Sequence, residues 1–180
     1  MVKKRPAIIL DRDGVLTQRP FLTWRKDQLK LSEGIAKEIS FFNKNKIPVV
    51  VISNQGVVAR GLISEKGVET LNQILQKRLK NKGAYIDKFY FCPHHPNATI
   101  KKYRTVCKCR KPNTGMFKLA AKEFDIDLKK SITIGDMTQD ILAGKQAKTT
   151  TILVKSGHGG SDKKYKVEPD YKVSNARKAL

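Results

Sequence analysis

Short runs of apolar and β-branched residues, each followed by a polar side chain, constrain the fold of this 180-residue chain more than any other feature. Runs of four or five such residues are typical of buried strands in a parallel sheet. The three clearest are residues 7–10 before Asp11, residues 49–52 before Ser53, and residues 131–134 before Gly135-Asp136. We therefore predict three strands with polar side chains at their carboxyl ends.

Stretches with helical spacing of apolar residues alternate with these runs. Ser32 and Ser64 are suited to cap the first two helices, because a serine hydroxyl can accept a hydrogen bond from a free backbone N–H. The other predicted elements are helices at 116–124 and 138–146 and strands at 86–91, 150–154 and 171–173. This alternation predicts one layered α/β domain over residues 1–180, with a mostly parallel sheet.

The predicted topology brings distant residues together. Right-handed crossovers place the carboxyl ends of parallel strands at one edge of the sheet, where ligands of open α/β sheets bind. Asp11 and Asp13 form an Asp-x-Asp-Gly turn at that edge. An acidic turn without chemistry or a calcium loop is the alternative, but an EF-hand needs an acid at its fifth position and glycine at its sixth. Glycine is fourth here, which argues against calcium.

Further groups suited to phosphate and metal follow the other strands. Ser53 and Asn54 offer a hydroxyl, an amide and loop N–H groups for phosphate oxygens, and Lys111 offers a positive charge. Asp136, with Asp140, offers carboxylates to a hard metal such as magnesium. Each feature alone also fits a turn or a solvated helix residue, but their joint occurrence at strand ends indicates a phosphate-processing site.

The order of Asp11-Arg12-Asp13-Gly14, Ser53, Lys111 and Gly135-Asp136 resembles the four motifs of the haloacid dehalogenase superfamily. The resemblance covers nearly the whole chain and implies a three-layer Rossmann-like fold. It also implies that Asp11 attacks phosphorus and that Asp13 acts as acid and then base. Magnesium would be held by Asp11, the backbone carbonyl of Asp13, and Asp136. Ser53 and Lys111 would position the phosphoryl group.

The three cysteines lie within one loop, residues 92–109. Cys-x-His at Cys92 and His94, paired with Cys-x-Cys at Cys107 and Cys109, gives three thiolates and an imidazole. This is a complete tetrahedral zinc set with no open position, so the metal is expected to be structural. His95 is the competing ligand, and three buried reduced cysteines beside a histidine is the alternative.

The same loop narrows the resemblance to the D-glycero-D-manno-heptose 1,7-bisphosphate 7-phosphatases and the related histidinol-phosphate phosphatases. The match implies that Arg110 contacts the substrate, and that Ser53, Asn54, Gln55 and Gly56 line its phosphate end. There is no room for a large cap domain, so a capless enzyme is expected. The segment 15–21 departs from the group, and Arg19 reverses a charge near the expected sugar end.

A formal net charge of +21 favours an anionic ligand without identifying it. We predict a cytoplasmic, monomeric phosphatase that acts on a phosphorylated small molecule, in particular a sugar bisphosphate, with no membrane segment. The alternatives are a histidinol-phosphate phosphatase, a polynucleotide 3′-phosphatase, which the charge would suit, and a binding module without catalysis.

Overall fold

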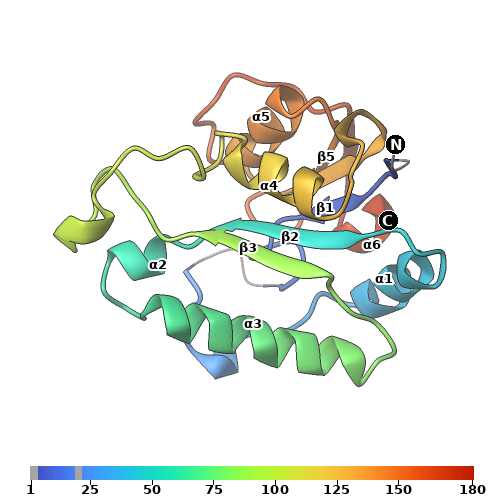
Figure 1. The fold of residues 1–180 in the computed structure, drawn as a ribbon, viewed down its shortest axis with the longest axis horizontal. Coiled ribbons are helices and arrows are strands. Elements are labelled where there is room, and N and C mark those ends of the chain that lie inside the picture. The colour runs from blue at the N-terminus through green and yellow to red at the C-terminus, as the bar shows by residue number, and fades with distance from the viewer. Residues whose placement is uncertain (1–3, 19–21) are drawn as a thin grey trace.

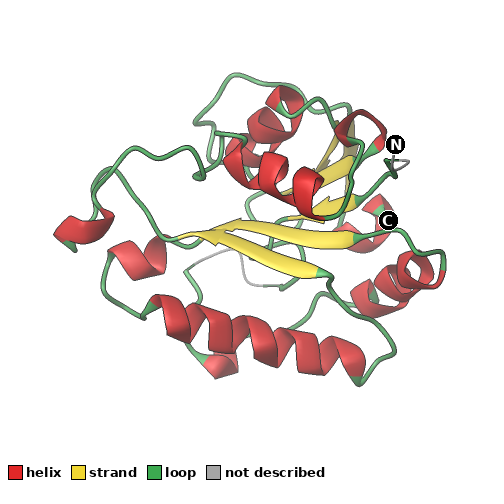
Figure 2. Cartoon of the chain, viewed as in Figure 1, coloured by secondary structure: helices red, strands yellow, loops and turns green. Residues whose placement is uncertain are grey.

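The computed structural model describes residues 4–18 and 22–180. Arg19, which the sequence singled out for substrate choice, lies outside the described residues. The described chain forms a sheet covered by helices on both sides (Figure 1), as the colouring by secondary structure in Figure 2 makes plain. None of the helices in these ranges is both long enough and apolar enough to cross a membrane.

The sheet has six strands in the order β3-β2-β1-β4-β5-β6. Neighbouring strands of the described chain pair in parallel throughout, so the predicted mostly parallel sheet is confirmed. The strands are β1 (Ile8–Leu10), β2 (Val49–Asn54), β3 (Lys88–Cys92), β4 (Ile132–Gly135), β5 (Thr150–Val154) and β6 (Tyr171–Val173). The order reverses between β1 and β4, and such a switch point opens a crevice at the carboxyl ends of the strands.

Helices form the two outer layers. Their bounds are α1 (Ile35–Lys44), α2 (Gly56–Ala59), α3 (Glu65–Lys80), α4 (Gly115–Glu123), α5 (Thr138–Gln146) and α6 (Ala176–Ala179), with short 3-10 helices at Lys26–Gln28, Lys101–Tyr103 and Leu128–Lys130. Figure 1 shows α1 and α3 on one side of the sheet and α4 and α5 on the other. The short α2 and α6 were not predicted from the sequence.

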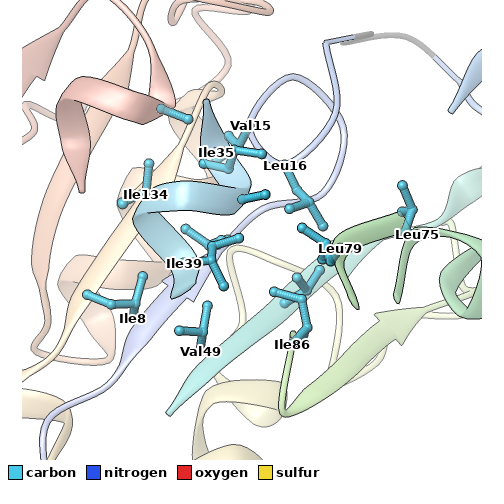
Figure 3. Packing of buried hydrophobic residues seen from close by; sticks show 14 of the residues in the cluster. Ile8, Val15, Leu16, Ile35, Ile39, Val49, Leu75, Leu79, Ile86 and Ile134 are labelled. Carbon is cyan, nitrogen blue, oxygen red and sulfur yellow. The ribbon is translucent and has the colours of Figure 1, made fainter. Parts of the chain in front are cut away.

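Successive residues of a strand point alternately into two separate hydrophobic cores, one on each face of the sheet. Ile8 points into the core under α1 and α3, which also contains Ile39, Leu75 and Leu79, and Figure 3 shows the side chains of this cluster. Ile9, the next residue of β1, packs instead with Phe117 of α4 on the opposite face. This period of two explains why the central strands are apolar on both sides, and it fixes the three-layer arrangement.

The two predicted helix caps have different outcomes. The Ser64 side chain accepts a hydrogen bond from the Gly67 N–H, at 3.1 Å, so that cap is confirmed. The prediction for Ser32 is wrong, because its hydroxyl donates to the Val15 carbonyl at 2.6 Å. Gly34 takes the cap position of α1 in a left-handed conformation, with φ of 71°. The serine thereby ties the loop after β1 to the start of α1.

Candidate active site

The three strand ends that the sequence singled out do converge, and Lys111 lies at their centre. Its ammonium group donates to Asp11 Oδ1 at 2.6 Å and to the Ile52 carbonyl at 2.6 Å. It also lies 2.7 Å from Asp140 Oδ1. The two carboxylates hold the pKa of the buried lysine above its usual range, outweighing desolvation, so the side chain stays charged. Lys111 is thus fixed beside the carboxylate expected to attack phosphorus.

Asn54 orients the segment that carries this lysine. Its side-chain oxygen accepts from the Lys111 backbone N–H at 2.9 Å, and its side-chain nitrogen donates to the Lys111 carbonyl at 3.0 Å. The amide therefore pairs with one residue in both directions, as a neighbouring strand would. Asn54 was predicted to contact phosphate, and it lines the cleft, but these two bonds give its amide a structural task in the described chain.

Asp136 is completely buried between two loops. Gly14 and Gly157 press on its carboxylate with left-handed backbones, φ of 89° and 73°, and a Cβ at either position would overlap Oδ2. The His158 N–H donates to Oδ2 at 2.7 Å. The other oxygen, Oδ1, has no hydrogen-bond partner among the described residues. The sequence interpretation found Asp136 but missed Gly157 and His158, for which the glycine-rich run after residue 154 was the available signal.

The electrostatics of the carboxylates favour a bound cation. Burial raises the pKa of Asp11 to about 7 and that of Asp136 to about 9, and repulsion from Asp140 adds to both shifts. Oxygen atoms of Asp11, Asp136 and Asp140 all lie within 4.8 Å of one another. An unpartnered buried oxygen in such a cluster fits a hard divalent ion, which would offset the repulsion. Asp11 and Asp136 match the predicted magnesium ligands.

Asp13 and Ser53 face each other across the side chain of Gln55. The Gln55 amide nitrogen donates to Asp13 Oδ2 at 3.0 Å and to Ser53 Oγ at 2.7 Å. Ser53 and Gln55 are almost fully buried, while the Asp13 carboxylate keeps some exposure to the cleft. The predicted acid/base and the predicted phosphate-binding hydroxyl therefore belong to one hydrogen-bonded chain.

The cysteine loop gathers its four predicted ligands. Sulfur–sulfur distances among Cys92, Cys107 and Cys109 are 3.0 to 3.4 Å, and His94 Nδ1 lies 3.5 Å from Cys109 Sγ and 3.6 Å from Cys92 Sγ. Three sulfurs and one nitrogen so close together fit a tetrahedral zinc ion. The assignment to His94 rather than His95 agrees with this geometry.

A cleft of about 310 Å³ opens above the strand ends. Its lining includes Asp11, Asp13, Ser53, Asn54, Gln55, Gly56 and Arg110, together with Arg60, His95, His158 and Lys164. The sequence interpretation placed none of these last four in the cleft and considered His95 only as a zinc ligand. The Arg110 guanidinium donates to the His94 carbonyl at 2.8 Å, which ties the cleft wall to the metal loop. A larger hollow, of about 1210 Å³, lies beside α1 and contains none of the predicted site residues, so volume alone does not locate the chemistry.

Comparisons with known proteins agree with this arrangement. A family model described as HAD-hydrolase-like matches residues 108–179. The D-glycero-beta-D-manno-heptose-1,7-bisphosphate 7-phosphatase of Rhodopseudomonas palustris is 40% identical over 144 residues, which cover 80% of each chain. The enzyme of the same name from Escherichia coli K12 is 34% identical over 158 residues, covering 87% of this chain and 83% of its own.

Solved structures lead to the same group. The D,D-heptose 1.7-bisphosphate phosphatase from B. bronchiseptica, complexed with magnesium and phosphate, superposes with a TM-score of 0.83 at 28% identity, covering 96% of this chain and 94% of its own. The fold and the site define a haloacid dehalogenase-type phosphatase. Within that class, the chain belongs to the D-glycero-D-manno-heptose 1,7-bisphosphate 7-phosphatase family.

Proposed function

We propose that this phosphatase removes the 7-phosphate of D-glycero-D-manno-heptose 1,7-bisphosphate through an aspartyl-phosphate on Asp11. In the first step an Asp11 oxygen forms a bond to phosphorus as the ester bond breaks, and Asp13 gives its proton to the leaving oxygen. In the second step Asp13 takes a proton from water, whose oxygen attacks phosphorus and releases Asp11. Inorganic phosphate and the dephosphorylated sugar are the products.

The resting geometry supports these roles. Lys111 neutralises charge beside Asp11, which lowers the repulsion that a phosphoryl group meets as it approaches a carboxylate. Ser53 offers its hydroxyl from the neighbouring strand end. Magnesium held by Asp11, Asp136 and the carbonyl of Asp13 would supply further charge neutralisation at the transferring group. Zinc held by the cysteine loop would keep Arg110 at the cleft wall.

A basic group of side chains at the cleft carries the proposal for a bisphosphate rather than a monophosphate. Arg60, Arg110 and Lys164 line the cleft with His95, and none of these three cations forms an ion pair within the described ranges. Burial and the nearby charges of Arg110, Arg60 and Lys164 lower the pKa of His95. Such unbalanced positive charge suits a second phosphate on the substrate.

A phosphate-release panel tests the proposal. It compares both anomers of the heptose 1,7-bisphosphate, the heptose 7-phosphate, histidinol phosphate and an oligonucleotide with a 3′-phosphate, and phosphorus NMR identifies which phosphate leaves. We expect the bisphosphate to have the highest kcat/KM, about 10- to 100-fold above the 7-phosphate, because only the bisphosphate engages the basic group. Rapid turnover of the oligonucleotide alone, or of histidinol phosphate alone, would overturn the assignment.

Variants separate chemistry from recognition in the same panel. Asp11→Asn removes the nucleophile and should abolish turnover, whereas the exposed carboxylate of Asp27 provides a matched control in Asp27→Asn. Arg110→Ala should erase the preference for the bisphosphate and leave the 7-phosphate rate nearly unchanged. Lys108→Ala, in the same loop but not in the cleft lining, is its control. A preference that survives Arg110→Ala would refute the second-phosphate contact.

A further inference from the structure

Arg12, between the two catalytic aspartates, is the largest side chain of the described chain with almost no exposure, at 0%. Burying a guanidinium is costly unless its donors are satisfied. The hydrogen-bond partners that satisfy the donors of a buried guanidinium therefore determine its position. Neither the motifs nor the proposed mechanism gives this arginine a task.

The Arg12 guanidinium donates hydrogen bonds to the Asp13 carboxylate from two nitrogens. Its Nε lies 3.2 Å from both carboxylate oxygens of Asp13, and its Nη2 lies 2.9 Å from Oδ2. Contact through two nitrogens fixes the plane of a carboxylate as well as its position, unlike the point charge of a lysine. Thr17, whose hydroxyl lies 3.4 Å from Asp13 Oδ1, adds a third contact.

Gln55 closes the arrangement from the other side. Its side-chain oxygen accepts from Arg12 Nη2 at 2.8 Å, while its nitrogen donates to Asp13 Oδ2 at 3.0 Å. The arginine thus settles which way the amide points, since the oxygen must face the guanidinium. The same amide nitrogen reaches Ser53, so Arg12 indirectly orients the phosphate-binding hydroxyl as well.

The Nη1 nitrogen of the guanidinium is anchored to α3, outside the cleft. Nη1 donates to Asn72 Oδ1 of α3 at 3.3 Å, and Nη2 lies 3.4 Å from the Thr23 carbonyl. Asn72 is itself 8% exposed and lies on the buried side of a 16-residue helix. Through Arg12, the position of Asp13 therefore depends on α3 as well as on its own loop.

We propose that Arg12 is a positioning residue for proton transfer: it fixes the plane and the direction of the Asp13 carboxyl group, so that this group faces the leaving oxygen. This inference rests on the proposed acid/base role of Asp13. The ester oxygen receives the Asp13 proton as the phosphorus–oxygen bond breaks. The carboxylate that remains faces the guanidinium until water returns a proton in the second step.

The dependence on the leaving group tests the proposal. An alkyl phosphate needs a proton on its leaving oxygen, whereas p-nitrophenyl phosphate leaves well without one. Arg12→Gln and Arg12→Lys should lower kcat/KM for an alkyl phosphate by about 10²-fold and for p-nitrophenyl phosphate by less than about tenfold. Equal losses on both substrates would mean that Arg12 has only a structural task, and would overturn the inference.

A double-variant comparison distinguishes this failure from a failure of the mechanism. In an Asp13→Asn background, Arg12→Gln should cause little further loss, because the group that it positions is already absent. If Asp13→Asn lowers kcat/KM equally for the alkyl phosphate and for p-nitrophenyl phosphate, the proposed acid role is wrong. If Asp13→Asn causes the larger loss on the alkyl phosphate and Arg12→Gln causes equal losses on both substrates, the inference about Arg12 alone is wrong.

Asn72→Leu keeps the test decisive should the Arg12 variants fail to fold. It removes only the remote anchor and should lower the alkyl phosphate rate three- to tenfold more than the p-nitrophenyl phosphate rate, on the general scale of one lost hydrogen bond. Asn43→Leu is the matched control, since Asn43 is 9% exposed and bonds to Tyr85 far from the cleft. A leaving-group effect that is equal in both variants, or absent from Asn72→Leu, would contradict the proposal.

Discussion

The crevice at the sheet edge and the loop of residues 92–109 both gather metal-binding side chains, but they are built in opposite ways. The crevice takes Asp11 from the end of β1, and Asp136 and Asp140 from the end of β4 and from α5, which lie more than a hundred residues further along the chain. Asp136 and Asp140 are buried and Asp11 is nearly so, and their carboxylates repel one another. The loop takes all four ligands from one local segment, and its residues 99–106 are exposed apart from the half-buried Tyr103.

The difference teaches which site depends on its metal. In the crevice the sheet and its two cores hold the ligands whether or not a cation is present, so the fold bears the cost of burying Asp136, whose Oδ1 has no partner among the described residues. The loop has few apolar contacts of its own, so a metal must replace the missing core. Removal of a ligand should therefore have opposite effects on stability at the two sites.

The largest effect is expected in the loop. Cys107→Ser should lower the free energy of unfolding by roughly 3 kcal/mol or more and reduce the zinc content below one per chain, because a tetrahedral site loses a thiolate. Activity should fall too, since the Arg110 N–H lies 3.3 Å from Cys107 Sγ and its side chain is tied to His94. Denaturant unfolding and metal analysis measure both changes.

Lys108→Ser provides the control, because it alters the neighbouring residue of the same loop without touching a ligand. Its zinc content and stability should match those of the parent. A parent protein that is folded, stable and free of zinc would contradict the metal loop, as would a Cys107→Ser protein as stable as its control.

The contrast also explains what the sequence could and could not predict. The zinc ligands were predictable because their spacing is local, and Asp11, Ser53 and Asp136 because strand ends meet at one edge, whereas Lys111, in the loop before α4, was placed by the family resemblance. Gly157 was missed because its importance lies in its packing against Asp136, which no local pattern records. Contacts of this kind depend on which loops the sheet brings together.

Burial was equally hard to predict. Arg12 is an ordinary surface residue by type, and only the enclosure by Asp13, Gln55 and Asn72 turns it into an interior one. The Ser32 cap failed for a related reason, since the hydroxyl had a long-range partner in Val15. Hydrophobic periodicity predicts the layers of the fold, whereas polar contacts between distant loops become visible only in the three-dimensional structure.

The second prediction concerns the crevice and has the opposite sign. Asp136→Asn should raise the free energy of unfolding of the metal-free protein by about 1–2 kcal/mol, because folding of the parent must either protonate Asp136, whose pKa burial raises to about 9, or bury its charge near Asp11 and Asp140. The amide can still accept from His158. Thermal unfolding in a chelator measures the gain, and added magnesium should then stabilise the parent but not the variant.

Asp162→Asn is the matched control for this prediction. Asp162 accepts bonds from the N–H and the hydroxyl of Thr138, at 2.9 and 2.6 Å, so its carboxylate is well partnered. Its replacement should destabilise the protein. A loss of stability in Asp136→Asn as well would show that the crevice carboxylates serve the fold, and the contrast between the two metal sites would fail.

The smallest effect is expected for Asp170, a carboxylate outside both sites. It accepts from Lys145 at 2.5 Å and from the N–H and hydroxyl of Thr151, each at 2.8 Å, and these bonds lower its pKa to about 2. A folded pKa below the unfolded value of 3.8 gives stability that is present above pH 3.8 and is lost as the pH falls through 2. Because the side chain is 38% exposed, solvent screening reduces the contribution to about 1 kcal/mol or less.

Asp170→Asn should therefore be less stable than the parent at pH 7 by that amount, and the difference should narrow as the pH falls towards 2. Urea unfolding at several pH values measures it, with Asp27→Asn as the control, since Asp27 forms an exposed pair with Arg25. A difference that stayed constant or widened in acid would show that the charge of Asp170 contributes nothing. Asp170 would then not serve as an example of a carboxylate that stabilises the fold, and the destabilising effect expected for Asp136 would have no comparison.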